Sequence, residues 1–332
     1  MIITALLLLA FLFLLPMVLL GDRGASARPN PPEPAVLTPP PVAGEEESVD
    51  RSKTLTLFHR ETGAVEHLSM EDYLRGVVAA EMPASFRTEA LKAQAVAART
   101  YTLRKAAAAT PRHPDAMVCD AHTCCQAYTA PEEAVAEWGA EAEFYSAKIA
   151  LAVAETDGLV LTYGGELIDA VFHSSSADFT ADAAQVWGRA VPYLVPVSTP
   201  EGEEVPNYRT TVTVSLEQFK SGIQSLYPAA VFGEDYTAWF GPAEYTASGA
   251  VACLPAGGAR VTGVEYRSLF GLRSAKFTLK AGEEGVTFSV TGYGHGAGMS
   301  QYGANALAAQ GVDFEGILTH YYTGCGLEKW GE

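Results

Sequence analysis

The stretch GVVAAEMPASF, from Gly76 to Phe86, places one carboxylate at the end of an apolar run. Ser69 upstream can cap a helix, and Pro83 ends it, because the residue before a proline avoids the α-helical region. Glu81 is therefore expected on the last helical turn, where the helix dipole and apolar neighbours both raise the pKa of a carboxyl group. A carboxyl group that titrates near neutrality can act as an acid and then as a base.

The same carboxylate also has a purely structural interpretation. Arg75 lies on the same predicted helix, and Arg99 lies on a second helix, predicted over residues 88–105. An ion pair between Glu81 and either arginine would perturb the pKa of the carboxyl group and would serve only the scaffold.

A third helical segment is predicted over residues 131–155, and the pattern then changes to alternating and β-branched runs. The predicted strands are residues 158–163, 166–176, 208–215, 259–268, 274–280 and 286–292. A glycine-rich loop follows and leads into helices over about 299–310 and 314–322. This order predicts a mixed α+β fold, in which a helical N-terminal part is followed by a β-rich lobe, inserted at about 190–290, and by C-terminal helices.

The N-terminus is unlike the rest of the chain. Nineteen apolar residues from Ile2 to Leu20 are about enough to cross a bilayer. The absence of a preceding Lys or Arg favours an uncleaved anchor over residues 1–21, whereas GASA at 24–27 is a candidate signal-peptide cleavage site. Residues 22–51 are rich in proline and are expected to form an extended spacer, which holds a globular domain over 52–332 outside the cell membrane.

The overall charge narrows the range of partners. The chain has 22 basic and 39 acidic residues, which gives a net charge of −17. Nucleic acids and anionic lipid surfaces require clustered Lys and Arg. We therefore expect no nucleic-acid partner.

The segment CDAHTCCQAY places four soft ligands, Cys119, His122, Cys124 and Cys125, within seven residues. This density is more typical of a zinc site than of a disulfide framework. A disulfide such as Cys119 with Cys124 is the alternative, because a domain outside the membrane meets oxidising conditions. The total of five cysteines is odd, so they cannot all pair with one another.

Two later segments combine small residues with hydrogen-bonding side chains, namely VFHSSSADFTADA from Val171 and GYGHGAGMSQYGA from Gly292. The glycines of the second segment imply unusual backbone angles or close approach of a ligand, but their spacing matches no nucleotide-binding loop. A serine turn and a buried histidine are the structural alternatives. The candidate ligand-binding residues are His173, Ser174, Ser175, His295, Gln301 and Tyr302.

Taken together, VVAAEMPASFRTEALKAQAVAARTY, VFHSSSADFTADA and GYGHGAGMSQYGANALAAQG resemble, in this order, the signature segments of the stage II sporulation protein D family. These proteins are peptidoglycan lytic transglycosylases of endospore-forming bacteria, and the resemblance covers about residues 69–326. It implies that Glu81 is the catalytic residue. The implied reaction cleaves the β-1,4 bond between N-acetylmuramic acid and N-acetylglucosamine without water and leaves a 1,6-anhydro sugar end.

The resemblance further implies a glycan cleft formed by the two later segments. One carboxylate is sufficient for this reaction, whereas water-dependent glycosidases use two. Asp178, Asp182 and Glu89 are the candidates for a second acid. In relatives two glycines usually follow the serines, and here Ala177 and Asp178 take their places, so the shape of this loop is expected to differ.

For the metal, some relatives have a zinc-binding Cys-x4-His-Cys motif. Cys119 and Cys125 match it, while Cys124 stands at the position of the histidine and His122 lies two places earlier. The third ligand is thus either Cys124 or His122. The zinc is expected to be structural or to order the cleft.

The implied partners are glycan strands stripped of their stem peptides, the membrane through the N-terminal helix, and two sporulation proteins. These two are the amidase stage II sporulation protein P and the membrane protein stage II sporulation protein M, at the engulfing membrane. Two alternative functions stay open: a non-catalytic module that binds the wall or activates an amidase, and a zinc amidase.

Overall fold

The computed structural model describes residues 48–107, 113 and 115–331. The predicted anchor over 1–21 and most of the proline-rich spacer lie outside the described residues. No helix in the described part of the chain combines the length and the apolar character that a membrane crossing requires.

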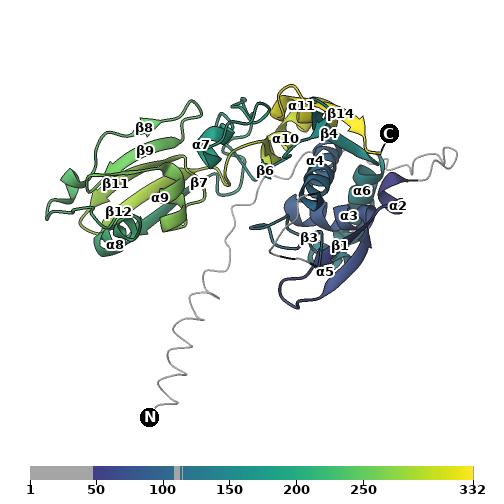
Figure 1. The fold of residues 1–332 in the computed structure, drawn as a ribbon, viewed down its shortest axis with the longest axis horizontal. Helices are drawn as coiled ribbons and strands as arrows, with labels where there is room; N and C mark the ends of the chain where they lie inside the picture. The colour runs from purple at the N-terminus through teal and green to yellow at the C-terminus, as the bar shows by residue number, and fades with distance from the viewer. Residues whose placement is uncertain (1–47, 108–112, 114, 332) are drawn as a thin grey trace, which may run out of the picture.

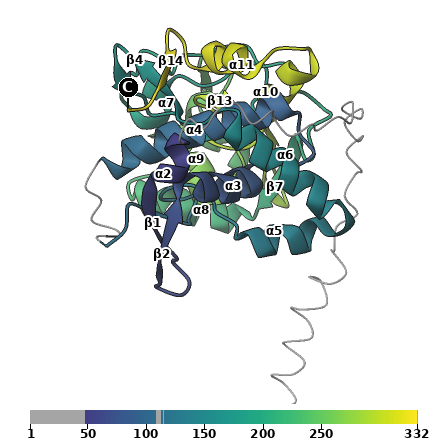
Figure 2. The same ribbon diagram turned by 90° about the vertical axis from the view of Figure 1, so that its right-hand side faces the viewer.

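Helix α4 (Thr88–Ala106) forms the centre of the helical part, and α3 (Met70–Glu81), α6 (Ala142–Ala154), α10 (Gln301–Ala309) and α11 (Phe314–Tyr321) pack around it (Figures 1 and 2). Its sequence explains this place, because buried alanines on several faces let neighbouring helices approach closely. The prediction of a helix over 88–105 is confirmed.

Helix α3 begins and ends at the residues that the sequence indicates. The Ser69 side chain accepts a hydrogen bond from the backbone N–H of Asp72, which caps the first turn. At the other end Met82 is extended and Pro83 follows, so Glu81 is the last helical residue.

The helix predicted over 131–155 is interrupted. It divides into α5 (Pro131–Trp138) and α6, with a single 3₁₀ turn, η1 (Gly139–Glu141), between them. Gly139 has a φ of 55°, a left-handed conformation that stops α5.

Five small sheets are found in the described residues, with strand orders β2-β1-β3, β14-β4-β5, β13-β6, β10-β9-β8 and β11-β12-β7. The helical part carries β1 (Thr54–Phe58), β2 (Val65–Ser69), β3 (Val118–Cys119), β4 (Leu159–Tyr163), β5 (Glu166–Leu167), β6 (Phe172–His173), β13 (Met299–Ser300) and β14 (Gly326–Lys329). The β-rich part carries β7 (Arg209–Val214), β8 (Glu244–Tyr245), β9 (Val251–Ala256), β10 (Ala259–Val261), β11 (Phe277–Gly282) and β12 (Gly285–Thr291), with α8 (Leu216–Leu226) and α9 (Gly263–Phe270). The mixed α and β composition of the fold is confirmed.

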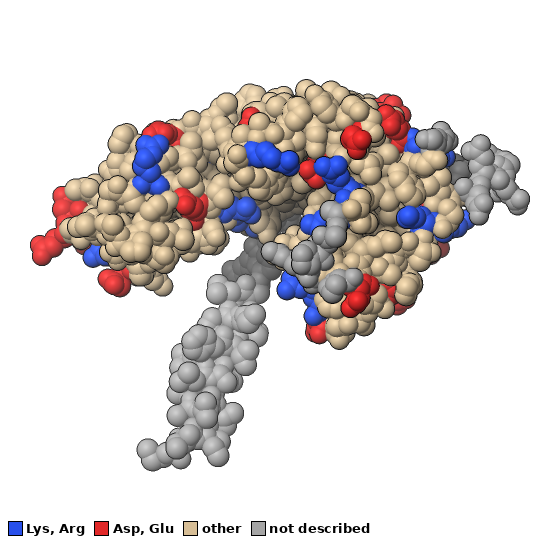
Figure 3. Space-filling view, in the orientation of Figure 1, with Lys and Arg blue, Asp and Glu red and all other residues tan. Residues whose placement is uncertain are grey.

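The described residues form two large hydrophobic cores. The first surrounds α4, and the second is built on aromatic side chains of the β-rich part, including Phe219, Tyr266 and Phe288. Figure 1 shows the two parts side by side along the long axis. On the face shown in Figure 3, acidic and basic side chains are interspersed and form no continuous basic surface.

The strand predicted over 259–268 is corrected by the structure. Only Ala259–Val261 is extended, as β10, and the remainder is helix α9. The reason is a capping box, in which the Thr262 side chain accepts from the Glu265 backbone N–H while the Glu265 carboxylate accepts from the Thr262 backbone N–H. These paired bonds start a helix although β-branched residues precede it.

The fold begins inside the segment predicted as spacer. Residues Val49–Ser52 form α2, and the buried carboxylate of Asp50 accepts hydrogen bonds from Nε and Nη2 of Arg99 on α4 at 2.8 and 2.5 Å. Both side chains are almost fully buried, with exposed fractions of 1% for Arg99 and 3% for Asp50. This ion pair joins the first described turn to the central helix.

Two neighbouring segments connect the β-rich part to the helical part. The chain enters at Tyr208 and returns at Gly292, whose N–H donates to the Tyr208 carbonyl at 2.8 Å. Beside them, Lys276 of the β-rich part donates to the Ala177 carbonyl and contacts the Asp178 carboxylate at 3.0 Å. Asp178 has a φ of 65°, a conformation that favours glycine, and the Lys276 contacts hold this position in place.

Candidate active site

A cavity of about 630 Å³ lies between the two parts of the molecule. Its walls are the C-terminal end of α3, the segment 122–127, β6, the glycine-rich loop at 293–295 and one residue of α9. The cavity is therefore lined by all four sequence segments that were singled out as functional, including the cysteine segment.

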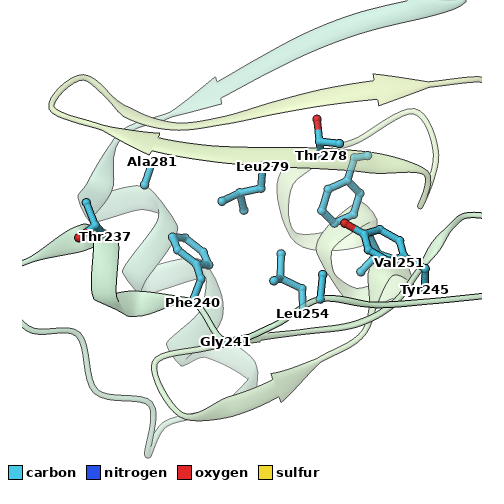
Figure 4. A pocket seen from close by; sticks show the side chains of 11 residues that line it. Thr237, Phe240, Gly241, Tyr245, Val251, Leu254, Thr278, Leu279 and Ala281 are labelled. Atoms are coloured by element: carbon cyan, nitrogen blue, oxygen red, sulfur yellow. The ribbon is translucent and has the colours of Figure 1, made fainter.

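A second cavity, of about 330 Å³, lies inside the β-rich part (Figure 4). Apolar side chains such as Phe240, Leu254 and Leu279 surround it, and its lining contains no carboxylate, histidine, lysine or arginine. Its lining offers only the hydroxyl groups of Thr237, Tyr245 and Thr278, without a carboxylate or histidine that could activate them.

Glu81 lines the first cavity from the last turn of α3. Its carboxylate accepts a hydrogen bond from the backbone N–H of Ala127 at 2.7 Å and a longer one from Nε2 of Gln301 at 3.5 Å. Burial raises the pKa of Glu81, and the two hydrogen bonds and nearby His122 only partly oppose this. The group is thus more readily protonated than an exposed glutamate.

The structural interpretation of Glu81 as an ion-pair partner is wrong. Arg75 contacts Glu71 and Asp72, and Arg99 contacts Asp50. Within residues 48–107, 113 and 115–331, no Lys or Arg pairs with Glu81.

Glu81 is also the only carboxylate among the described residues that line the cavity. The three other acids considered from the sequence are occupied elsewhere. Glu89 pairs with Lys92, Asp178 pairs with Lys276, and Asp182 caps α7 (Ala183–Trp187).

The two candidate histidines line the cavity but are held by the protein. The Nδ1–H of His173 donates to the Ala297 carbonyl at 3.1 Å, and its Nε2 accepts from the Ser176 hydroxyl at 2.6 Å. Burial lowers the pKa of His173 to about 3 and that of His295 to about 4. Both rings are neutral at physiological pH. The structural alternative was a backbone-bonded buried histidine at position 295, and Nδ1 of His295 accepts a hydrogen bond from the Ala297 N–H at 3.1 Å.

Of the other predicted ligand-binding residues, Ser174 and Gln301 line the cavity, whereas Ser175 and Tyr302 do not. Ser175 pairs through its backbone with Tyr293, and the Tyr302 ring packs edge-on against Phe86. These two residues support the walls from behind.

A buried carboxylate fixes the two loops of the cavity relative to each other. Glu201 accepts from the Ser176 backbone N–H at 2.8 Å and from the Ser300 hydroxyl at 2.5 Å. Ser300 caps α10, the helix that carries Gln301. Glu201 thereby positions Gln301, which contacts Glu81.

Sequence reasoning missed Trp187, Arg267 and Tyr293 as lining residues. The exposed fractions of Trp187 and Tyr293 are 49% and 43%, which is high for aromatic side chains and leaves ring faces available for a ligand. Tyr293 stands within the glycine-rich segment and could have been noted there, but Trp187 and Arg267 reach the cavity only through tertiary structure.

The predicted metal site is corrected in one ligand. His113, Cys119, Cys124 and Cys125 place their ligand atoms within 4.8 Å of one another, whereas His122 lies outside this cluster and lines the cavity near Glu81. His113 lies six residues before Cys119, outside the segment from Cys119 to Cys125 in which the ligands were predicted. None of the five cysteines forms a disulfide.

The cluster fits a tetrahedral zinc ion. Nε2 of His113 lies 3.4 Å from Sγ of Cys125 and 3.8 Å from Sγ of Cys124, close to the roughly 3.5–3.8 Å that neighbouring ligands of a tetrahedral zinc require. Nδ1 of His113 contacts the Ala116 carbonyl at 3.2 Å, which leaves Nε2 as the ligand. Three thiolates and one imidazole would close the site, so a bound zinc would stabilise the segment that leads to Ala127.

We expect the purified chain to contain roughly one zinc ion, because four protein ligands form a complete structural site. Elemental analysis of the wild type and of single variants tests this. His113→Asn and Cys119→Ser should lose the metal, and His122→Asn should retain it. Metal retained in His113→Asn and lost in His122→Asn would contradict this assignment of the ligands.

Comparison with known proteins gives a consistent family assignment. Residues 59–163 match the family described as Stage II sporulation protein (SpoIID). The chain is 34% identical to Stage II sporulation protein D of Bacillus amyloliquefaciens over 313 residues, which cover 93% of this chain and 89% of the relative. It is also 34% identical to Stage II sporulation protein D of Bacillus subtilis (strain 168), over 98% of this chain and 95% of the relative. An Amidase enhancer of Bacillus subtilis (strain 168) is 28% identical over 77% of this chain and 40% of the relative.

Proposed function

The chain belongs to the stage II sporulation protein D family, and from this membership and the geometry around Glu81 we propose that it cleaves the glycan strands of peptidoglycan as a lytic transglycosylase. The observation that carries the proposal is a single partly buried carboxylate, without an ion pair among the described residues, in a cavity large enough for sugars.

In the proposed reaction Glu81 begins in its protonated form. It donates its proton to the glycosidic oxygen while the bond from C1 of N-acetylmuramic acid to that oxygen breaks. The carboxylate then accepts the proton of the 6-hydroxyl of the same sugar, and the 6-oxygen bonds to C1. One proton leaves Glu81 and one returns, so no water is consumed.

The geometry supports this route over hydrolysis. A hydrolytic glycosidase needs a second carboxylate, either about 5 Å or about 6.5–9.5 Å from the first. The described lining of the cavity supplies none. The contacts with Ala127 and Gln301 orient the Glu81 carboxylate and stabilise it after its proton has left.

Product analysis tests the reaction. Peptide-free glycan strands are incubated with the protein, and the ends are identified by mass spectrometry. New ends that lack the mass of one water, relative to reducing sugars, are expected. New reducing ends without this deficit would show hydrolysis and overturn the proposal.

The raised pKa of Glu81 predicts the direction of the pH dependence. Because the first step needs the protonated acid, kcat/KM should fall as the pH rises through the pKa of Glu81, which burial places above the ordinary value of about 4.3. His173 and His295 titrate at about 3 and about 4 and contribute no change near neutrality. The profile is measured for the wild type and for His122→Asn. An alkaline limb that disappears in His122→Asn would assign the titration to the imidazole instead.

A second candidate function is a module that binds the wall and activates an amidase. It is favoured by the similarity to the Amidase enhancer, whose name carries that activity. A release assay on purified cell walls, with and without a sporulation amidase, distinguishes the two. Stimulation of the amidase without new glycan ends would favour the module.

We propose the cellular location and the partners of this protein from its family membership. The domain acts outside the cell membrane during sporulation, anchored by the apolar N-terminal segment. It works after an amidase has removed stem peptides, with the proteins P and M of stage II sporulation as partners.

A further inference from the structure

Arg267 differs from the surface arginines of the β-rich part, and from Arg273, whose guanidinium stacks on the Tyr293 ring. It lies on α9 and is the only Lys or Arg among the described residues that line the cavity. Arg209 and Arg260 pair with Glu203 and Glu244 on the surface. Across the described chain, by contrast, the guanidinium group of Arg267 makes neither a hydrogen bond nor an ion pair, whereas its backbone carbonyl accepts a hydrogen bond from the Leu272 N–H.

The surroundings of Arg267 leave its charge uncompensated. Burial lowers its pKa, yet a guanidinium stays charged at any physiological pH. His173 and His295, whose pKa values are lowered by burial and in part by the charge of Arg267, are neutral and supply no negative charge to offset it. Partial desolvation of an unpaired cation is unfavourable, so this position is ready to accept an anion.

The planar shape of the Arg267 guanidinium limits which anions it can bind well. A guanidinium presents a planar fork of N–H donors that fits a carboxylate or a phosphate with two parallel hydrogen bonds. In a chain with a net charge of −17, a simple inorganic anion is repelled over most of the surface. An anion that is covalently part of a larger ligand is favoured, because the rest of the ligand contributes binding energy.

The neighbouring side chains indicate what the rest of that ligand is. The Trp187 ring lies 5.2 Å from His295, and the Arg273 guanidinium covers one face of Tyr293 at 3.7 Å. Both aromatic rings are partly exposed and line the same cavity as Arg267. Aromatic faces beside a few fixed polar groups suit a sugar ring, which has an apolar face and a polar edge.

We propose that Arg267 binds the lactyl carboxylate of a muramic acid residue from which the stem peptide has been removed, and that it makes the cavity selective for such glycan. The proposal rests on the proposed function, because it takes a peptidoglycan strand as the ligand. While a stem peptide is attached, the lactyl carboxyl group is an uncharged amide and cannot pair with the guanidinium. Removal of the stem peptide creates a negatively charged lactyl carboxylate and also removes the steric hindrance of the peptide.

Binding to matched glycans tests this, with cleavage prevented by Glu81→Gln in the full-length chain. The ligands are short peptide-free glycan fragments and the same fragments after conversion of their lactyl carboxylates to methylamides. Isothermal titration calorimetry measures Kd for the parent, for Arg267→Met, for Arg267→Lys and for the control Arg260→Met, whose site is exposed and outside the cavity.

The parent should bind the carboxylate form roughly 10- to 100-fold more tightly than the methylamide form, as expected for a charge-assisted pair. Arg267→Met should lose this preference and bind both forms like the parent binds the methylamide. Arg267→Lys should retain part of it, and Arg260→Met should behave as the parent. Circular dichroism establishes that each variant is folded.

Several results would overturn the proposal: no preference in the parent, a preference that persists in Arg267→Met, equal weakening of both ligands by that substitution, or no binding of either fragment. These outcomes are independent of catalysis. A carboxylate preference that depends on Arg267, together with an absence of anhydro products from the wild type, would support this inference and refute the transglycosylase activity.

Discussion

Glu81→Gln is expected to reduce kcat for glycan cleavage by at least ~10³-fold, because one side chain supplies both proton transfers and each is typically worth ~10²–10⁴. Glutamine is nearly isosteric and can still contact Ala127 and Gln301, so affinity for glycan should change little. A loss of kcat without a comparable rise in KM is therefore the expected result. It is measured by the rate of appearance of anhydro ends from peptide-free strands.

The matched control for this substitution is Glu132→Gln, an exposed acid on α5 that lies outside the cavity. It should leave the rate unchanged. Because Glu81 is a partly buried carboxylate without an ion pair among the described residues, its replacement by a neutral group should also raise the free energy of unfolding at neutral pH. Retained cleavage in Glu81→Gln would mean that another group carries the chemistry.

Arg99→Met is expected to lower the free energy of unfolding by about 3–5 kcal/mol, because it leaves Asp50 charged and without its partner in the interior. The substitution also removes the hydrogen bond from Nη1 of Arg99 to the Leu159 carbonyl, at 3.0 Å. Urea unfolding, followed by circular dichroism, measures the effect.

Two further variants separate the buried pair from a general effect of charge. Arg209→Met removes an exposed pair with Glu203 and should leave the free energy of unfolding almost unchanged. The double variant Arg99→Met, Asp50→Leu should recover much of the loss, since it leaves no buried charge. A double variant as unstable as Arg99→Met would show that packing around α4, and not the unpaired carboxylate, causes the instability.

Local rules predicted the element that carries the proposed acid. Ser69 and Pro83 fix both ends of α3 through capping and through the conformation that proline imposes, so the place of Glu81 follows from neighbouring residues. The break at Gly139 and the helix after Thr262 depend on equally local features, a left-handed glycine and a capping box. The alanine-rich sequence around Gly139 favoured one continuous helix, and the β-branched residues before Thr262 favoured a strand. The glycine and the capping box are the two local signals that predict the helix break and the helix start.

The remaining parts of the site depend on tertiary structure. His113 contributes to the cluster from six residues before Cys119, and the density of cysteine and histidine after Cys119 favoured ligands within that later segment. Arg267 reaches the cavity from helix α9, whose Tyr266, Leu269 and Phe270 pack into the second core. Its lack of a partner is visible only when every neighbouring acid has been placed.

The junction at Tyr208 and Gly292 has a consequence for how such proteins diversify. Because the two crossing segments are hydrogen-bonded neighbours, a lobe of another size can be exchanged between them without altering α3 or α10. Such an exchange would replace Arg267, which lies in the β-rich part, whereas Glu81 lies in the helical part and would be retained. The residues that recognise the ligand and the residue that cleaves it thus lie on separable parts of the chain. An ancestral cleaving domain could therefore gain a new ligand specificity by recombination.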